Sequence, residues 1–208
     1  MITLYGYPRT RSLRVSWLLE ELGLEWQYQL VNFAKGEHKS AEYLLLCPQG
    51  KVPTLYDEDI VITESAAICI YLAEKYGTHW LPEPATAVSA RHMEWVSFII
   101  TELEQPLWSM GKHKFALPEP IRLPEMLPVA SWEFKKAVQT AESWLPDSAF
   151  LLGNFPTVAD ILLTHTLNWA VKFDQKLPQK LEKYRQNMSR RPALLRALNH
   201  EQQALTDN

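Results

Sequence analysis

Cysteine is scarce in this sequence. Only Cys47 and Cys69 occur among 208 residues, and no CxxC motif is present. Paired or clustered cysteines are the usual sequence signs of disulfide exchange or of zinc binding. We therefore expect no disulfide and no metal site, and we interpret both cysteines as reduced, mostly buried thiols.

Long apolar runs and an excess of basic residues are also missing. No run is long enough to cross a bilayer, and residues 1–5 lack the basic region and apolar stretch of a signal peptide. The formal net charge is -3, whereas nucleic-acid-binding proteins carry a basic patch or stripe. These observations predict a cytoplasmic protein with neither a nucleic acid nor a membrane as partner.

The first 78 residues show the pattern of an α/β domain. An apolar run at residues 2–6 predicts a strand, and Val15, Leu18, Leu19 and Leu22 then share one helical face that ends at Gly23. A strand at 28–33 would complete a β-α-β unit with parallel strands. Next we expect a short helix at 41–46, a hairpin formed by 52–56 and 60–62, and a helix from 64 to 77. The predicted order is therefore βαβ followed by ββα.

The rest of the chain shows only helical patterns. A proline-containing linker at 79–86 leads to helices predicted at 88–110, 131–145, 157–172, 179–189 and 192–203. The four prolines within 117–128 predict a loop or a broken helix there. The sequence thus predicts a domain of residues 1–78 and an all-helical domain of residues 86–208.

The turn after the first strand carries Thr10, Arg11 and Ser12. In a β-α-β unit this turn faces a helix N-terminus, where free N–H groups and the helix dipole favour an anion. Thioredoxin-like proteins have a CxxC here, so this chain cannot itself cycle a disulfide at the turn. Its two hydroxyls and arginine would instead stabilise a thiolate supplied by a ligand. The alternative is that Thr10 or Ser12 only caps the helix.

Two further short motifs have the character of a binding site. Val52-Pro53, just before a strand, is a plausible cis peptide that would expose the Val52 backbone to a peptide-like ligand. At the next helix start, Ser65 can donate to a carboxylate and Glu64 can accept from an ammonium group. Taken separately, the two motifs also fit an ordinary strand-leading proline and an ordinary helix start.

Together these motifs resemble the glutathione S-transferase superfamily, across essentially the whole chain. The most telling stretches are Gln-Gly-Lys-Val-Pro-Thr-Leu at 49–55 and Ile-Thr-Glu-Ser-Ala-Ala-Ile at 62–68. The run at 11–23 resembles the first helix of bacterial and fungal members. Residues 153–160 resemble the family's helix-capping motif, in which Thr157 and Asp160 would satisfy each other's backbone N–H groups.

The resemblance implies a thioredoxin-like domain that binds glutathione as co-substrate, without a metal. Val52 would bind the cysteinyl backbone beside a cis Pro53, and Glu64 with Ser65 would hold the γ-glutamyl end. The remaining residues expected to contact glutathione are Arg11, Lys39 and Lys51. Thr10 stands where related sequences often have serine, so Thr10 and Ser12 are the candidate activating hydroxyls, with Tyr5 and Tyr7 as alternatives.

The implied activity is conjugation of the glutathione thiolate to small hydrophobic electrophiles by a cytoplasmic, homodimeric detoxifying transferase. Tyr7, Glu104 and Trp108 are the candidate residues of the second-substrate pocket. Three alternatives remain open. These are a glutathione-dependent peroxidase or disulfide reductase, a regulatory member without turnover, and a helical ligand carrier.

Overall fold

The computed structural model describes residues 1–206 and contains two compact units. The first unit consists of Met1–Leu81 together with the chain from Arg190 onward, and the second is Pro82–Ser189. By packing, the last helix therefore belongs to the first unit, although the sequence places it in a domain of residues 86–208. The domain limits predicted from the sequence, 1–78 and 86–208, stay predictions.

The first unit is built on a four-stranded mixed sheet. Its strands are β1 (Ile2–Gly6), β2 (Trp26–Leu30), β3 (Thr54–Asp57) and β4 (Ile60–Thr63), in the order β2-β1-β3-β4. β1 is parallel to β2 and antiparallel to β3, which forms a hairpin with β4. This confirms the predicted β-α-β unit and hairpin.

The second strand is displaced from its predicted position at 28–33. It begins at Trp26 and ends at Leu30, because the chain turns directly afterwards. The side chain of Asn32 accepts hydrogen bonds from the N–H groups of Ala34 at 3.0 Å and Lys35 at 3.2 Å. An asparagine that binds the backbone two or three residues ahead stabilises a turn and competes with a strand.

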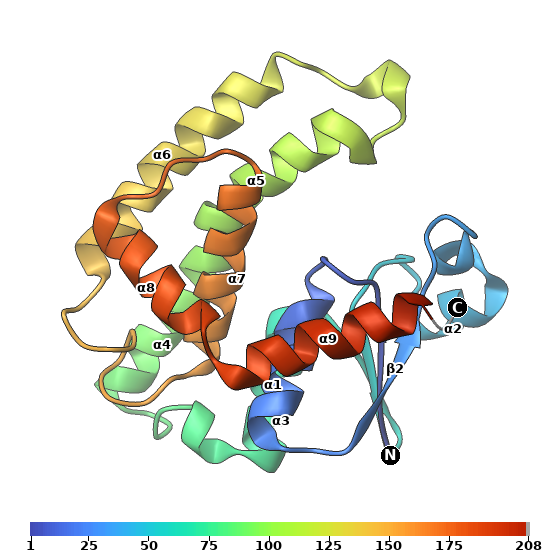
Figure 1. Ribbon diagram of the computed structural model, residues 1–208, viewed down its shortest axis with the longest axis horizontal. Helices are drawn as coiled ribbons and strands as arrows, with labels where there is room; N and C mark the ends of the chain where they lie inside the picture. Colours follow the sequence, from blue (N-terminus) through green and yellow to red (C-terminus); the bar gives the residue numbers. More distant parts are fainter. Residues whose placement is uncertain (207–208) are drawn as a thin grey trace. The chain divides into compact units, whose positions relative to one another are not determined.

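Helices cover the sheet of the first unit (Figure 1). They are α1 (Ser12–Leu22), α2 (Ala41–Leu46), α3 (Ser65–Tyr76) and α9 (Pro192–Thr206), with short 3-10 turns η1 (Glu37–Lys39) and η2 (Thr78–Trp80). α1 packs against both α3 and α9. The predicted stripe of α1 is buried at Val15, Leu18 and Leu19, and Gly23 ends the helix at φ 64 as predicted.

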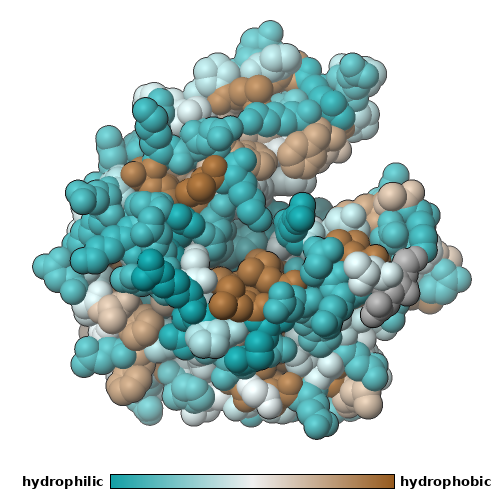
Figure 2. Space-filling model, in the orientation of Figure 1, coloured by the Kyte–Doolittle hydropathy of each residue, from teal (hydrophilic) through white to brown (hydrophobic). Residues whose placement is uncertain are grey.

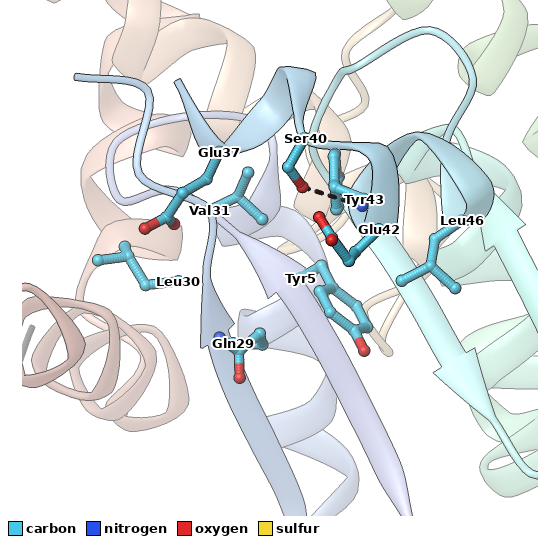
Figure 3. Close-up of a pocket in the computed structure, with 9 residues that line it drawn as sticks. All are labelled: Tyr5, Gln29, Leu30, Val31, Glu37, Ser40, Glu42, Tyr43 and Leu46. Atoms are coloured by element: carbon cyan, nitrogen blue, oxygen red, sulfur yellow. Dashed lines mark hydrogen bonds between the residues drawn. The ribbon is translucent and has the colours of Figure 1, made fainter. Parts of the chain in front are cut away.

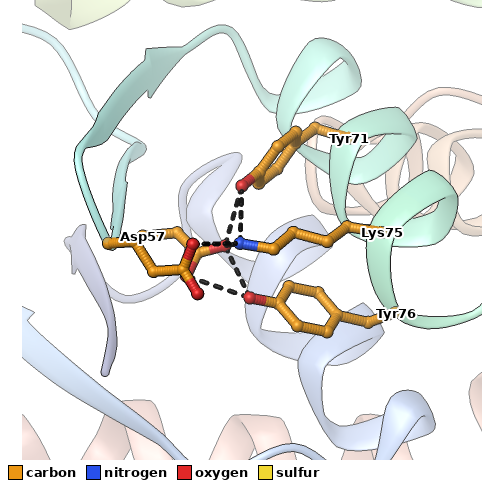
Figure 4. A network of polar contacts seen from close by, with 5 residues as sticks. Asp57, Tyr71, Lys75 and Tyr76 are labelled. Carbon is orange, nitrogen blue, oxygen red and sulfur yellow. Dashed lines mark hydrogen bonds and ion pairs between the residues drawn. The ribbon is translucent and has the colours of Figure 1, made fainter.

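A polar network ties the hairpin to α3 (Figure 4). Asp57 is only 2% exposed and accepts hydrogen bonds from Tyr71 at 2.8 Å, from Tyr76 at 2.8 Å and from Lys75 at 3.0 Å. Burial opposes the charged form, but Lys75 and the two hydroxyls outweigh it and lower the pKa of Asp57. The network fixes the hairpin relative to the helix that begins at Ser65.

The second unit is helical throughout its regular elements. These are α4 (Ala87–Phe98), η3 (Ile99–Leu103), α5 (Glu104–Gly111), η4 (Lys112–Ala116), η5 (Glu119–Ile121), α6 (Met126–Trp144), α7 (Val158–Lys172) and α8 (Gln179–Ser189). η3 is a π-helical turn just before Pro106, whose missing N–H interrupts the regular ladder of helical hydrogen bonds.

The break predicted at 117–128 is wrong at its C-terminal end, because α6 begins at Met126. Pro128 lies in the first turn, where its N–H is not needed.

The predicted capping box at the start of α7 is confirmed. Asp160 accepts a hydrogen bond from the N–H of Thr157 at 2.8 Å. It also accepts from the Tyr184 hydroxyl at 2.7 Å and from the Leu151 N–H at 2.9 Å. The box therefore joins α7 to α8 and to the preceding loop, which agrees with a structural role.

Figure 2 shows hydrophilic side chains over most of the visible face, with hydrophobic side chains in separate patches. Within residues 1–206, no helix combines the length and the apolar character that a membrane crossing requires.

Candidate functional site

The turn between β1 and α1 brings the hydroxyls of Thr10 and Ser12 together. The two oxygens lie 2.9 Å apart, and Thr10 donates to the carbonyl of Tyr7 at 2.6 Å. In return, the Ser12 N–H donates to the Thr10 hydroxyl at 3.2 Å and the Tyr7 N–H donates to the Ser12 hydroxyl at 3.3 Å. These bonds fix the turn, so both residues have a structural role whatever their chemistry.

The two hydroxyls differ in their access to a ligand. Ser12 is the first residue of α1 and is 0% exposed, whereas Thr10 is partly exposed. The first N–H groups of a helix lack partners within the helix, and the dipole makes this end favourable for an anion. A ligand anion at the start of α1 would therefore meet Thr10 before Ser12.

The loop before β3 contains the cis peptide expected between Val52 and Pro53. Tyr43 holds both sides of this bend, since its hydroxyl donates to the carbonyl of Lys51 at 2.5 Å and lies 3.0 Å from the Thr54 hydroxyl. Within the described chain, neither main-chain polar group of Val52 has a hydrogen-bond partner. The Val52 backbone is thus open to a peptide-like ligand.

Glu64 and Ser65 lie at the junction of β4 and α3. Glu64 adopts φ 68 and ψ 110, a conformation that strains a residue with a Cβ atom. Its side chain is exposed and makes no cap hydrogen bond to the helix. Ser65 is 5% exposed and accepts a hydrogen bond from Arg14 at 3.2 Å. The strained backbone presents the carboxylate of Glu64 to solvent at the helix start.

Arg14 is a residue that our sequence analysis did not single out. It lies on α1, is 1% exposed, and donates through Nη1 to the Ser65 hydroxyl. The available sequence signal was its spacing, because Arg14 precedes the buried Leu18 by one helical turn and so shares its face. A charged side chain on an otherwise apolar helix face predicts a buried partner, since buried charges are rare unless paired.

The predicted basic contacts all belong to the first unit. Lys39 ends η1 and is exposed, Lys51 is exposed next to Val52, and Arg11 is partly buried at the start of α1. Their contact with glutathione stays a prediction.

The structure indicates a packing role for one of the aromatic candidates and leaves the substrate-pocket role of the other candidates as a prediction. The ring of Tyr5 lies 6.0 Å from that of Tyr43 and packs on a small buried cluster, which favours the structural interpretation of Tyr5. The ring of Tyr7 lies 4.9 Å from that of Phe33. In the second unit, Glu104 is buried and Trp108 is partly buried, both on α5. Their role, with Tyr7, in a second-substrate pocket stays a prediction.

A cavity of about 280 Å³ lies on the first unit between the sheet and α2 (Figure 3). Its lining residues come from β1, β2, η1, α2 and the segments between them: Tyr5, Gln29, Leu30, Val31, Glu37, Ser40, Glu42, Tyr43 and Leu46. None of the residues predicted to bind glutathione lines this cavity, and its one candidate activating group is the alternative Tyr5, whose packing favours a structural role. The sequence did not predict the cavity. We assign this cavity no part in the candidate site.

Both cysteines are free and buried. Burial raises the pKa of Cys69 to about 12, so this thiol stays protonated. Among residues 1–206, no three histidine, cysteine or acidic side chains are grouped in a way that could hold a metal ion. The turn at residues 6–12 contains no cysteine, so any thiolate there would have to be supplied by a bound molecule.

Comparison with known proteins shows the family of the chain. The family model of the glutathione S-transferase N-terminal domain matches residues 1–74, and the model of the C-terminal domain matches residues 109–192. The chain belongs to the glutathione S-transferase superfamily. It therefore belongs to a transferase family whose first domain is thioredoxin-like and whose second is helical.

Individual relatives support the same assignment. The chain is 36% identical over 146 residues to glutathione S-transferase theta-1 of Bos taurus, a match that covers 67% of this chain and 60% of that relative. It is 29% identical over 205 residues to glutathione S-transferase GstA of Escherichia coli O157:H7, covering 95% and 98% of the two chains. The structure of glutathione transferase URE2P8 from Phanerochaete chrysosporium, solved with oxidised glutathione, has a TM-score of 0.85, with 25% identity over 99% of this chain and 96% of that one.

Proposed function

We propose that the protein is a glutathione transferase that conjugates the glutathione thiolate to small hydrophobic electrophiles. The observation that carries this proposal is the hydroxyl-bearing turn at the start of α1. It offers Thr10 and a helix N-terminus to an anion but contains no cysteine of its own. Such surroundings favour the thiolate of a bound thiol over a disulfide formed by the protein.

Glutathione would lie across the first unit. The open main-chain groups of Val52, beside Pro53, would pair with the cysteinyl residue as in strand addition. Glu64 would accept from the γ-glutamyl ammonium, and Ser65 would donate to the neighbouring carboxylate. The cationic side chains of Arg11, Lys39 and Lys51 would supply further attraction for carboxylates of the ligand.

Thr10 is the hydroxyl that would contact the thiolate. Ser12 is buried beneath it and would act by orienting Thr10. A free thiol has a pKa of about 8.5, and a hydroxyl donor with a helix N-terminus lowers it by about one unit or more. The thiolate would attack an electrophilic carbon, forming the new sulfur–carbon bond as the leaving group departs with the electron pair of its own bond to that carbon.

The second substrate, the assembly and the location extend this proposal. Tyr7, Glu104 and Trp108 would line the hydrophobic substrate pocket, and the active form would be a homodimer, as the family resemblance implies. A cytoplasmic location and a role in detoxification stay predictions from the sequence.

A glutathione-dependent peroxidase or disulfide reductase is the second candidate. The presence of oxidised glutathione in the solved structure of a relative favours testing disulfides as substrates. Turnover of an aryl halide should exceed turnover of a hydroperoxide or of a mixed disulfide if conjugation is the main activity. A regulatory role without turnover is less favoured, because the chain retains Glu64, Ser65 and a Val52 backbone without a hydrogen-bond partner in the described residues.

The first test is calorimetric titration with glutathione of the wild-type protein and of Glu64→Ala. We expect wild-type binding between the micromolar and low-millimolar range, roughly -8 to -4 kcal/mol, and loss of measurable binding in Glu64→Ala. Glu58→Ala is the matched control, because Glu58 is also exposed and also has a positive φ, of 55°. Absence of binding by the wild-type protein would contradict the proposal and favour the regulatory role.

A further inference from the structure

We propose that Arg14 is a positioning residue that makes the Ser65 hydroxyl an obligatory donor, and so selects a ligand carboxylate over an uncharged amide at the start of α3. The inference rests on the proposed function and extends it to the residue that sets the specificity of the γ-glutamyl subsite. Neither the motif at 62–68 nor the helix pattern of α1 indicates this link.

The geometry begins with one buried hydrogen bond between two helices. Arg14 is the third residue of α1 and is 1% exposed, and Ser65 is the first residue of α3 and is 5% exposed. Nη1 of Arg14 lies 3.2 Å from the Ser65 hydroxyl oxygen. The two helices pack against each other. A second contact lies nearby, since the thiol of Cys69 lies 3.6 Å from the Arg14 carbonyl. The arginine is therefore held on both its side chain and its backbone.

The chemistry of the two groups decides the direction of this bond. A guanidinium group has five N–H donors and no acceptor, so the Ser65 oxygen must accept. The hydroxyl hydrogen of Ser65 is then left for a different acceptor, and within residues 1–206 none takes it. A carboxylate oxygen placed at the start of α3 would receive this hydrogen.

Charge acts in the same direction as the hydrogen bond. The guanidinium group of Arg14 is a cation, and it is buried next to the N-terminus of α3, where the helix dipole is also positive. Electrostatic interactions are stronger where water is excluded. A carboxylate therefore gains from the charge, from the dipole and from the Ser65 donor, whereas an amide gains little from the first two.

The test compares glutathione with an analogue in which only the α-carboxylate of the γ-glutamyl residue is a carboxamide. A second analogue, amidated at the glycine carboxylate instead, is the matched ligand control. Affinities are measured by calorimetry for the wild-type protein, Arg14→Met, Arg14→Lys, Ser65→Ala and the double variant Arg14→Met/Ser65→Ala. Arg91→Met, a change at a 71% exposed arginine, is the control substitution. Thermal unfolding of each variant checks that it is folded.

We expect the wild-type protein to bind glutathione at least about 10-fold more tightly than the γ-glutamyl amide, the size of one charge-assisted hydrogen bond. Arg14→Met should reduce this preference to less than about 3-fold, and Arg14→Lys should restore part of it. In the Ser65→Ala background, Arg14→Met should change the preference less than it does in the wild-type background, because the hydroxyl oriented by Arg14 is missing and only the direct effect of the charge remains.

Two results with the variants would overturn the inference. One is an unchanged preference in Arg14→Met, or in Arg14→Gln if Arg14→Met does not fold. The other is an equal loss of affinity for both ligands, which is the mark of a purely structural role. If the wild-type protein binds neither glutathione nor the analogues, the proposed function itself fails. That result is distinct from equal binding of glutathione and the γ-glutamyl amide by the wild-type protein, which contradicts the inference but not the proposed function.

Discussion

The hydroxyl oxygen of Thr10 lies 2.9 Å from the hydroxyl oxygen of Ser12, and 2.6 Å from the carbonyl of Tyr7. A hydroxyl has one hydrogen, so Thr10 can donate to only one acceptor at a time. The short bond to Tyr7 makes that carbonyl its partner in this structure. A thiolate that binds at the turn must compete with this carbonyl, and its full negative charge makes it the stronger acceptor.

Substitution of Thr10 should therefore separate the two proposed hydroxyls. Thr10→Ala should raise the pKa of the bound glutathione thiol by about one unit and lower kcat/KM by about 10- to 100-fold, because a charge-assisted hydrogen bond is lost. Thr10→Ser keeps the donor and should retain most of the activity. The thiol pKa is followed by the ultraviolet absorbance of the thiolate as pH is varied.

Ser12→Ala is the comparison for this prediction. Ser12 is buried and accepts from the N–H of Tyr7, so its loss should reduce the free energy of unfolding by about 1–3 kcal/mol. Its effect on turnover should be smaller than that of Thr10→Ala. Normal turnover and an unchanged thiol pKa in both alanine variants would contradict the assignment of the activating group.

Close contact between Gly6 and Tyr28 leads to the second prediction. A Cβ atom at Gly6 would lie 2.7 Å from the Tyr28 hydroxyl and 2.9 Å from Cβ of Ser12. Gly6→Ala should therefore destabilise the protein by about 1–3 kcal/mol and distort the Thr10 turn. The Tyr28 hydroxyl itself is buried without a hydrogen-bond partner in the described chain.

Removal of this hydroxyl should relieve the shortest of these contacts, while Cζ of the ring would still lie 2.9 Å from the added Cβ atom. Tyr28→Phe should be neutral or slightly stabilising alone, because an unpartnered buried hydroxyl contributes no hydrogen bond. Combined with Gly6→Ala, it should recover part of the lost stability, as measured by urea unfolding of all four proteins. Strict additivity of the two changes would show that the residues do not meet as described.

The carboxylate of Asp57 gives the third prediction. Asp57→Asn should lower the free energy of unfolding by about 2 kcal/mol, because the charge-assisted bonds with Lys75, Tyr71 and Tyr76 are weakened. Glu58→Gln is the matched control, since Glu58 also pairs with Lys75, at 3.1 Å, but is 66% exposed. Exposed ion pairs contribute little, so this change should cost less than about 0.5 kcal/mol. Equal effects of the two substitutions would contradict a special role for the buried carboxylate.

The pH dependence of this stabilisation has a definite sign. The pKa of Asp57 is lower in the folded than in the unfolded protein, so its contribution is complete above the unfolded value of about 3.9 and is lost as pH falls through the folded value. The wild-type advantage over Asp57→Asn should therefore decrease as pH falls below about 3.9.

Local sequence patterns predicted much of this fold. The apolar spacing of Val15, Leu18 and Leu19 and the glycine at 23 located α1. Thr157 and Asp160, three residues apart, predicted the capping box that the structure contains. These features depend on neighbours in the sequence, so one chain is enough to identify them.

Features that depend on distant residues were not predicted. The packing of α9 on α1 and the bond between Arg14 and Ser65, 51 positions apart, both depend on how helices meet in space. The strained backbone of Glu64 also follows from the junction of β4 with α3, since glutamate has no preference for φ 68. Part of the candidate site could therefore be identified by motif resemblance, but the residues that orient it could not.

Acid should destabilise the protein through His92 on α4. This histidine is 2% exposed, and its Nε2 has no hydrogen-bond partner among the described residues. Burial lowers its pKa to about 4, whereas an unfolded histidine titrates near about 6.5. Between these values the unfolded chain binds a proton that the folded protein does not. The free energy of unfolding should therefore fall by up to about 3 kcal/mol as pH decreases from 6.5 to 4.

His92→Leu should remove this part of the acid sensitivity. The measurement is urea unfolding at several pH values between 7 and 4, with the difference in stability between the variant and the wild-type protein plotted against pH. Other titrating groups contribute equally to both proteins, so the difference isolates His92. The variant should gain relative to the wild-type protein as pH falls below 6.5. A difference independent of pH would mean that the pKa of His92 is the same in the folded and the unfolded protein, which would contradict the lowering of this pKa by burial.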